Sequence, residues 1–528
     1  MNQFIFSKLF ISNTSLLKKL ILTMLCGYLI IGTGLHGDDY SVIKQWDLSS
    51  FIVITPQNLG LKIFGVPDYL TFWWAYPVFG FQYQLLYDCL KWISHLASIL
   101  MSWKFFTLFL NTHRALAASI FFIFLPLHES TTYWYMVTAY IFWPSLIMLS
   151  FYFIEKDKKI TGFLVGIIGA FSFYISPPYV FGLSMIFLIR KEYNKFILFT
   201  MPGILYVINY FLIKYLFPFA EKRISKELNI IIFIKNLMLQ FLGILDSFLG
   251  PSSLLKIYYS SISIGYISLI VALAIIIFFW QILKYKYINS PLFIINFNLQ
   301  KDLIIGSISV LIISLIIFSL TGLYVPSPFN LGNRSLVYGS LITSVLLASI
   351  SINRINLIFI WFLFVLPVFG ISDHWKDWNN RQIFIINNIR TNREFRLLNN
   401  NDCIAITGNI YNKLGPFSHI EFFSMPWVVD SIFKDATGLT NVFAISQSIS
   451  AEGNIFIDKK FERQFICSHN IYFYDTDHNI LKIGTISDAY ALINNRQKEN
   501  RHWIQFVKGT FVESIIVVLS PRLSVLFK

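Results

Sequence analysis

Residues 16–40 of the chain read LLKKLILTMLCGYLIIGTGLHGDDY. An apolar run long enough to cross a bilayer follows Lys18 and Lys19 and ends at the carboxylates of Asp38 and Asp39. The two lysines favour a cytoplasmic N-terminus. Because no small-residue cleavage site precedes the carboxylates, we expect an uncleaved anchor and not a signal peptide. Acidic side chains where a span meets water cost free energy and usually have a function.

The composition extends this interpretation to all 528 residues. Hydrophobic residues make up 55% of the chain and charged residues only 13%, and the mean hydropathy is +0.61. A water-facing surface would need roughly twice that charged fraction, so the composition predicts a polytopic α-helical membrane protein in contact with membrane lipid. The net charge of +14 would suggest a nucleic-acid partner for a soluble protein. Here we expect it to reflect cytoplasmic loops, with no nucleic acid bound.

About eleven segments are apolar enough to be predicted as transmembrane helices. Three are short or interrupted, and Ser176-Pro177-Pro178 predicts a break between two half-length helices. The segment at residues 230–249 contains Lys235, Gln240 and Asp246, and we expect it on the outer surface. The predicted spans are residues 16–35, 81–110, 115–127, 135–154, 160–175, 178–189, 196–217, 257–283, 303–324, 336–350 and 355–370.

The loops between these spans differ in charge. When the spans are threaded alternately through the bilayer, every inner loop carries Lys or Arg, as cytoplasmic loops do. The inner loops contain His113-Arg114, Glu155-Lys156-Asp157-Lys158-Lys159, Arg190-Lys191, Lys284 with Lys286, and Arg354. Residues 1–370 are therefore predicted to form a transmembrane domain, with a first outer loop at about residues 36–80.

Residues 371–528 have a different composition. Charged residues, Asn and turn dipeptides become frequent, and short β-like runs occur at residues 454–457 and 465–473, which predicts an extracytoplasmic α/β domain. Its last apolar run, residues 514–519, is too short to span, and we expect a strand or a surface-seeking tail. Cys403 and Cys467 can pair in such a compartment, and the sequence leaves this open. Cys26 and Cys89 are expected to be inert buried thiols.

Asp38 and Asp39 are the first candidate catalytic residues. A carboxylate at an outer helix end can act as general base on an attacking hydroxyl, or it can bind a divalent cation such as Mg²⁺ or Mn²⁺ that neutralises a leaving phosphate. The alternative is that the pair caps an interfacial helix. Its position directly after the first span favours function more than the same pair would in a soluble protein.

His128 and Glu129 are the second candidate pair. Because Pro126 ends a span, both should emerge on the same face of the membrane as the acidic pair. They can bind a metal or orient an acceptor hydroxyl, with Glu129 as a further catalytic carboxylate. The alternative is that both are solvated at a helix end and that the following aromatic residues form an interfacial belt.

Arg334, in Asn333-Arg334-Ser335 at the outer start of a later span, is a candidate phosphate ligand. Its guanidinium presents a rigid fork of donors, and a helix N-terminus adds backbone donors beside it. The alternative is an arginine that reaches for lipid headgroups. Tyr40 and Trp134 are expected to contact substrate, and the aromatic run at residues 72–76 is expected to anchor the interface or to stack on a sugar.

These motifs carry a resemblance to a known superfamily. A span ending in Asp38-Asp39-Tyr40, a long first outer loop and a span closing in Pro126-Leu127-His128-Glu129 resemble the GT-C superfamily of polytopic membrane glycosyltransferases. The chain is most similar to bacterial O-antigen glucosyltransferases of the Gtr type, and more distantly to protein O-mannosyltransferases and the lipid A aminoarabinose transferase. The similarity is clearest over residues 16–195 and rests on topology further on. His128 and Glu129 are adjacent here, whereas many relatives separate them by one residue.

The resemblance implies a multi-pass glycosyltransferase of the bacterial cytoplasmic membrane. A polyprenyl-phosphate sugar would enter from the outer leaflet, a cell-surface glycan would accept the sugar, and Asp38 or Asp39 would be the base or metal ligand. The C-terminal domain would cover the site. Two other classes remain open, an O-antigen polymerase and a transporter or flippase of lipid-linked saccharides. A transporter would need polar or broken spans in corresponding halves, and the break at Ser176-Pro177-Pro178 has no counterpart in the second half.

Overall fold

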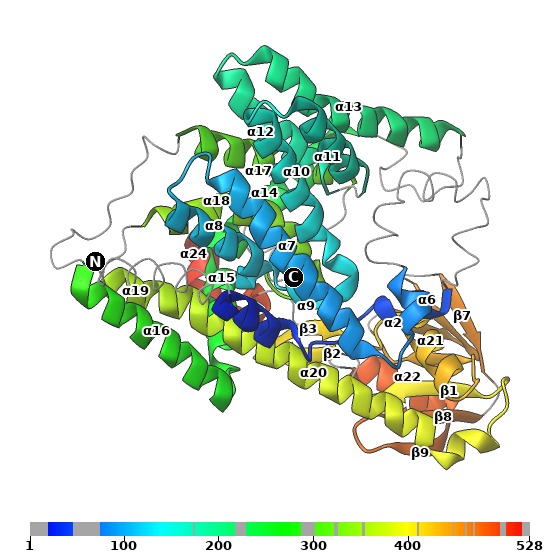
Figure 1. Ribbon diagram of the computed structural model, residues 1–528. Coiled ribbons are helices and arrows are strands. Elements are labelled where there is room, and N and C mark those ends of the chain that lie inside the picture. The colour runs from blue at the N-terminus through cyan, green and yellow to red at the C-terminus, as the bar shows by residue number, and fades with distance from the viewer. Residues whose placement is uncertain are drawn as a thin grey trace.

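The computed structural model describes residues 20–45, 74–172, 175–216, 229–286, 301–321, 326–350, 354–408, 411–446, 448–459, 462–467, 470–496 and 503–519. Helices make up most of the molecule, and a strand-containing region lies at one end of it (Figure 1). The helices of the first half are Leu20–Ile30, α2 (Asp39–Gln45), α6 (Ala75–Phe79), α7 (Gln84–Phe106), α8 (Thr112–Phe124), η2 (Pro126–His128), α9 (Ser130–Tyr133), η3 (Tyr135–Val137), α10 (Ala139–Glu155), α11 (Lys159–Ser172), α12 (Pro177–Ile189) and α13 (Tyr193–Leu216).

Local sequence signals fix several helix ends. Asn111 and Asn229 cap α8 and α14 by accepting the backbone amides of Arg114 and Ile231. Proline occupies the first turn of α12 and α15, where its missing N–H costs nothing. The helices of the second half are α14 (Ile230–Leu249), α15 (Pro251–Ile262), α16 (Tyr266–Lys286), α17 (Lys301–Thr321), η4 (Leu331–Leu336), α18 (Val337–Ser349), α19 (Arg354–Ile360), the π-helical turn η5 (Trp361–Val365) and α20 (Leu366–Thr391).

Several of these helices are suited to a membrane. Within the described residues, five helices are long and apolar enough to cross one, or six if one bent pair counts as a span. The five are Tyr135–Glu155, Tyr193–Leu212, Ile230–Leu249, Lys301–Leu320 and Ile355–Thr391. This agrees with a helical membrane protein, while the count of eleven spans stays a prediction. Residues 230–249, expected on the outer surface, form one helix that meets the criterion for a span.

The predicted break at Ser176-Pro177-Pro178 separates two short helices. α11 has 14 residues and ends at Ser172, and α12 has 13 residues and begins at Pro177. The short length of both agrees with the prediction.

The span predicted at residues 257–283 is not one straight helix, because the chain bends by 108° between α15 and α16, and its crossing of a membrane stays a prediction. Asp373 stabilises the bend, because its carboxylate accepts the Gly265 amide at 2.8 Å and the Ser268 hydroxyl at 2.8 Å and so satisfies donors at the start of α16. On the other side, a Cβ at Gly370 would lie 1.8 Å from the Ser260 carbonyl oxygen, so only glycine lets α20 approach α15 this closely.

The helix predicted to end at Gly370 continues to Thr391 as α20. The predicted domain boundary at residue 370 therefore lies inside a helix. In Figure 1, α20 runs from the helical region beside α19 to the strand-containing region. It packs on the N-terminal helix, where the Ser372 hydroxyl donates to the Leu29 carbonyl at 2.7 Å and the Lys376 ammonium donates to the Tyr28 carbonyl at 2.6 Å.

Three small sheets form the strand-containing region. β1 lies between β4 and β8 and runs parallel to both, and β9 pairs antiparallel with β8 at the edge. β2 and β3 form a hairpin, and β5, β6 and β7 form an antiparallel sheet. The strands are β1 (Cys403–Thr407), β2 (Tyr411–Leu414), β3 (Phe417–Glu421), β4 (Val442–Ala444), β5 (Ile449–Glu452), β6 (Ile455–Asp458), β7 (Arg463–Ile466), β8 (Asn470–Asp475) and β9 (Ile480–Thr485).

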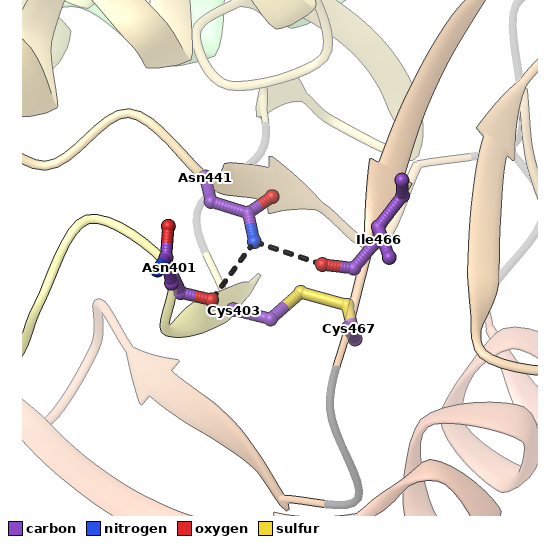
Figure 2. Close-up of a disulfide and its surroundings, with 5 residues drawn as sticks. All are labelled: Asn401, Cys403, Asn441, Ile466 and Cys467. Carbon is purple, nitrogen blue, oxygen red and sulfur yellow. Dashed lines mark hydrogen bonds between the residues drawn. A yellow bond between two sulfur atoms is a disulfide. The ribbon is translucent and has the colours of Figure 1, made fainter.

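A disulfide joins Cys403 and Cys467, the pairing that the sequence left open. Its Cα atoms lie 5.3 Å apart, and it ties β1 to the residue after β7 (Figure 2). Beside it, the Asn441 side-chain amide donates to the carbonyl oxygens of Asn401 at 3.4 Å and Ile466 at 3.0 Å. The bridge therefore connects the four-stranded sheet with the antiparallel sheet.

The remaining helices complete the C-terminal region. α21 (Pro426–Ala436) packs beside β4 and α2, and α22 (Ile486–Asn495) begins with a capping box between Thr485 and Asp488. Residues 511–519 form helix α24, so a strand at residues 514–519 is wrong, and the alternative of a surface-seeking tail stays a prediction. One apolar core extends from the helices into the strand-containing region and includes Tyr40, Phe122 and Phe423.

Candidate functional site

The candidate site is organised around residues 126–137, which follow the end of α8. Pro126 lacks an N–H and follows an extended Leu125, so the α-helix stops at Phe124. The segment then makes three short helices, η2, α9 and η3, and residues 126–135 are all buried. α2, η4, α15, α20 and β3 surround it. Residues that the sequence placed far apart meet on this segment.

Asp39 lies at the start of α2 and is fully buried. One carboxylate oxygen accepts the Tyr76 hydroxyl at 2.7 Å and the Met136 amide at 3.1 Å, and the other accepts the His36 amide at 2.9 Å. Tyr76, expected to anchor the interface or to stack on a sugar, instead contacts this carboxylate. The acidic turn is thereby fastened to η3.

Burial raises the pKa of the Asp39 carboxyl to about 7. The hydrogen bonds from the His36 amide and the Tyr76 hydroxyl lower the pKa but do not offset the burial. Asp39 therefore changes charge close to neutral pH.

A buried ion pair supports the loop that precedes the acidic turn. The Lys91 ammonium lies 2.8 Å from the Asp88 carboxylate and donates to the Thr33 hydroxyl at 2.7 Å and to the Gly34 and Tyr133 carbonyls at 2.8 Å. Asp88 in turn accepts the amides of Gly32 and Gly34. The hydrogen bonds of Lys91 and Asp88 therefore hold the acidic turn against α7 and α9.

Asp38 differs from Asp39 in its exposure, since it is only partly buried. Its carboxylate accepts the indole N–H of Trp427 at 2.7 Å, and Trp427 lies in the first turn of α21. The strand-containing region thus contacts the acidic turn directly. Of the two aspartates, Asp38 is the one that is not fully buried.

Glu129 belongs to a buried charge cluster with Lys256 of α15 and His419 of β3. One carboxylate oxygen of Glu129 lies 2.7 Å from the Lys256 ammonium and 2.9 Å from Nε2 of His419. Nδ1 of His419 accepts the Asn330 amide at 3.1 Å, so a neutral ring carries its proton on Nε2 and donates it to Glu129. The cluster joins a helix, a loop and a strand that are distant in sequence.

The charges of this cluster are mutually dependent. Burial raises the pKa of the Glu129 carboxyl. Lys256 and His419 lower it by more than burial raises it, so the pKa falls to about 2. Burial and Lys256 lower the pKa of His419 to about 4, although Glu129 acts in the opposite direction. At neutral pH, Glu129 is therefore ionised and His419 is neutral.

His128 points away from this cluster. Its Nδ1 lies 2.8 Å from the Thr131 hydroxyl, and its Nε2 lies 3.0 Å from the Phe122 carbonyl. Both ring nitrogens are thus engaged by its own segment and the end of α8. Tyr40 is also buried in the core, where its ring stacks on Phe81 at a centroid distance of 5.9 Å.

Arg334 and Trp134 meet across the site. The Arg334 guanidinium lies 5.3 Å from the Trp134 ring centroid and 5.8 Å from that of Tyr140, so it binds both rings through their faces. Beside it, the Asn333 side-chain oxygen accepts the Ser130 amide at 3.2 Å and also the Ser130 hydroxyl. η4 is therefore fixed to α9 next to Glu129.

Several buried polar atoms around this segment have no hydrogen-bond partner among the described residues. They include one Glu129 carboxylate oxygen, the Asn333 side-chain nitrogen and the indole nitrogens of Trp134 and Trp375. Trp375 lies against the edge of His36, at a centroid distance of 4.5 Å. Such unsatisfied donors and acceptors cost free energy unless a polar ligand or water meets them. A hydroxyl-rich ligand matches this mixture of one acceptor and three donors.

The donor set offers little to a divalent cation. Within the described part of the chain, no group of three or more His, Cys, Asp or Glu side chains is arranged to hold a metal ion. Both oxygens of Asp39 already accept hydrogen bonds, and the ion-paired oxygen of Glu129 faces Lys256. Asp39 therefore has no oxygen set aside for a cation, and metal binding by Asp38 and Asp39 stays a prediction.

Three residues of the site did not stand out in the sequence. Lys256 precedes a predicted span, His419 lies in the predicted soluble domain, and Trp427 follows Pro426 at a helix start. None is part of a recognisable motif. Of the three, only Lys256 could have been noticed in the sequence. It lies beside an apolar segment, and a charge there needs a partner when it is buried.

In comparisons with known proteins, no family model, curated protein or solved structure matches the chain.

Proposed function

We propose that this protein is an inverting membrane glycosyltransferase of the GT-C type. It transfers a hexose, in the simplest case glucose, from a polyprenyl-phosphate carrier to a cell-surface glycan such as O-antigen. In this proposal the chain crosses the bacterial cytoplasmic membrane about eleven times, with its N-terminus in the cytoplasm and its C-terminal region outside. The lipid carrier delivers the activated sugar, so no nucleotide-sugar site is needed.

The observation that carries the proposal is the meeting of two elements, α2 and η4, on residues 126–137. Asp39 accepts the Met136 amide, Arg334 lies over the Trp134 ring, and Asn333 accepts the Ser130 amide next to Glu129. A carboxylate turn, a second carboxylate and a guanidinium are thus brought to one short segment. Transfer from a phosphate leaving group needs a base and a cation on the two sides of the anomeric carbon.

Asp38 is the proposed general base. It is the partly exposed member of the acidic pair, and Trp427 fixes one of its oxygens. The acceptor hydroxyl gives its proton to Asp38 while its oxygen forms a bond to the anomeric carbon. The bond from that carbon to the phosphate oxygen breaks at the same time, and polyprenyl phosphate leaves with the electron pair. Asp39 positions the turn and takes no part in the bond changes.

Arg334 is the proposed ligand of the leaving phosphate. A guanidinium held over two aromatic rings keeps its charge and its planar fork of donors. The Asn333 side-chain nitrogen and the Trp134 indole N–H, both without a partner among the described residues, are additional donors to the sugar or phosphate. Glu129, ionised beside Lys256, is the proposed acceptor for a sugar hydroxyl through its second oxygen.

The test is transfer by the purified full-length protein in lipid nanodiscs. A panel of polyprenyl-phosphate hexoses is mixed with candidate glycan acceptors, and the product is read by mass as acceptor plus one hexose. Asp38→Asn should lower the rate about 100-fold or more, as expected for loss of a general base. Glu452→Gln, which removes an exposed carboxylate of β5, is the control and should keep full activity.

The alternative classes give different products in the same assay. A polymerase would join repeat units and give a ladder of masses, and a flippase would move the lipid-linked saccharide without changing its covalent structure. Retained single-hexose transfer by Asp38→Asn at normal expression would remove Asp38 as the base. Absence of any transferred hexose with every donor and acceptor would remove the glycosyltransferase proposal.

A further inference from the structure

A hollow of about 340 Å³ lies where α11 and α13 begin. In Figure 1 this group of helices lies at the opposite end of the molecule from the strand-containing region. The hollow is separate from residues 126–137 and has no part in the proposed transfer. It is lined by Lys159, Lys191, Glu192, Tyr193, Asn194 and Lys195.

The lining carries an excess of positive charge. Lys195 is neutralised by Glu155 at 3.2 Å and by Glu192 at 3.0 Å. Lys159 and Lys191 are exposed, and neither has a carboxylate within ion-pair distance among the described residues. The nearby Glu155 and Asp302 are already engaged by Arg190, at 3.0 and 2.7 Å. Two ammonium groups at the mouth of the hollow are therefore available to an anion.

The two helices add donors of their own. A Cβ on Gly166 would lie 3.2 Å from Pro202, and Phe171 contacts Tyr206 at a centroid distance of 6.0 Å. Since these contacts follow the same order along both helices, α11 and α13 run parallel and both N-termini open at the hollow. The first-turn amides of a helix lack intrahelical acceptors, and a phosphate is their usual ligand.

Apolar side chains continue from the hollow along the same helices. Ile160 and Leu164 of α11 are 78% and 56% exposed, and Tyr193 and Ile197 of α13 are 58% and 55% exposed. Residues four apart lie on one helix face, so each pair forms a stripe that starts at the basic end. An exposed apolar stripe below a cationic site matches acyl chains below a charged headgroup.

We propose that this hollow binds the headgroup of an anionic phospholipid. The phosphodiester accepts hydrogen bonds from Lys159, Lys191 and the first-turn amides of α11 and α13, and the acyl chains lie along the stripes of Ile160, Leu164 and Ile197. The loop between α10 and α11 is an inner loop by its charge, so this lipid belongs to the leaflet opposite the proposed transfer site. The inference does not depend on the proposed glycosyltransferase activity.

The test is native mass spectrometry of the full-length protein in detergent. Phosphatidylglycerol and phosphatidylcholine are added at equal concentration, and the bound fraction of each is counted. The wild type should retain phosphatidylglycerol in preference to phosphatidylcholine. Lys159→Gln with Lys191→Gln should lower that occupancy about five-fold, because both free ammonium groups are removed. Lys459→Gln with Lys482→Gln, two exposed lysines of the strand-containing region, is the matched control and should retain full occupancy.

Three outcomes of the mass spectrometry would overturn the assignment. The first is equal occupancy by the two lipids, and the second is unchanged phosphatidylglycerol binding by the double variant. The third is complete displacement by millimolar inorganic phosphate, which would make the hollow a site for the free ion. A photo-crosslinking phosphatidylglycerol analogue gives a measurement on the wild type alone. Its crosslinks should fall on residues 159–168 and 191–201, and crosslinks elsewhere would contradict the proposal.

Discussion

The Lys256 ammonium lies 2.7 Å from the Glu129 carboxylate, across 127 residues of sequence, and both side chains are at most 2% exposed. Removing one partner of a buried ion pair destabilises the fold, because the other charge is left buried without compensation. His419 adds a third member from the strand-containing region. The pair therefore marks the place where the helical region and the C-terminal region depend on each other.

Removal of Lys256 should destabilise the protein. Lys256→Met leaves the Glu129 charge buried with only His419 beside it, and we expect a loss of about 3–5 kcal/mol in the free energy of unfolding. Adding Glu129→Gln to the same chain removes the uncompensated charge and should restore part of the loss. The measurement is the Tm of the purified protein in detergent. A Tm of the single variant equal to that of the wild type would contradict a stabilising role of Lys256.

Asp39 predicts a pH-dependent stability. Its folded-state pKa of about 7 lies above the value of ~3.9 for an unfolded aspartate, so the folded protein binds more protons between these pH values. The stabilising contribution is present at low pH and is lost as the pH rises toward and through 7, with a slope of up to ~1.4 kcal/mol per pH unit. The wild-type Tm should therefore fall between pH 5 and 7.5.

The matched comparison for this slope is Asp39→Asn. The asparagine keeps one carbonyl oxygen for Tyr76 and Met136 but cannot titrate, so its Tm should depend less on pH over the same interval. Glu452→Gln should keep the wild-type slope. Identical slopes in all three proteins would assign the pH dependence to other groups.

Trp427 should influence catalysis through Asp38. Trp427→Phe keeps the ring in α21 but removes the N–H that holds the Asp38 carboxylate at 2.7 Å. We expect a drop in kcat of about ten-fold, on the order of one hydrogen bond to a charged group, with little change in Tm. Trp503→Phe is the control, since it also removes an indole bond to an aspartate, Asp246 at 3.0 Å, away from residues 126–137. Equal effects of both substitutions would argue against a role in positioning.

The disulfide should stabilise the strand-containing region. Cys403 and Cys467 are 64 residues apart, and closing a loop of this length contributes about 2–4 kcal/mol. Cys403→Ser with Cys467→Ser should therefore make residues 400–496 more sensitive to limited proteolysis, as a reducing agent should in the wild type. Cys26→Ser, at a buried free cysteine, should leave that sensitivity unchanged. Protection equal to that of the wild type would mean that the bridge adds no stability.

The sequence predicted those parts of the fold that depend on local composition. Long apolar runs became helices, as in α17 (Lys301–Thr321), and the prolines at 126 and 177 ended or began helices where expected. The bend between α15 and α16 was missed, and the Asp373 carboxylate that stabilises it is 108 residues from Gly265 in the sequence. Hydropathy does not report contacts at that separation.

The candidate site, too, could be predicted from the sequence only in part. Asp38, Glu129 and Arg334 drew attention because charged residues beside apolar segments are unusual. Their partners Trp427, Lys256 and Trp134 could not be paired with them, since pairing is a property of the tertiary fold. His128 shows the opposite case: its place in a motif suggested a ligand, yet both ring nitrogens bond to neighbouring residues.

The continuous helix from Ile355 to Thr391 has a mechanical consequence. Its 37 residues span ~55 Å, whereas the hydrocarbon core of a bilayer is about 30 Å thick. A helix of this length acts as a strut whose far end rises or tilts with the thickness of the bilayer. Because Trp378 of this helix contacts Phe422, the residue after β3, a thinner or thicker membrane would shift the strand-containing region relative to the acidic turn. The chain length of the lipids would then change the rate of the proposed sugar transfer, although the lipids do not contact the reactive groups.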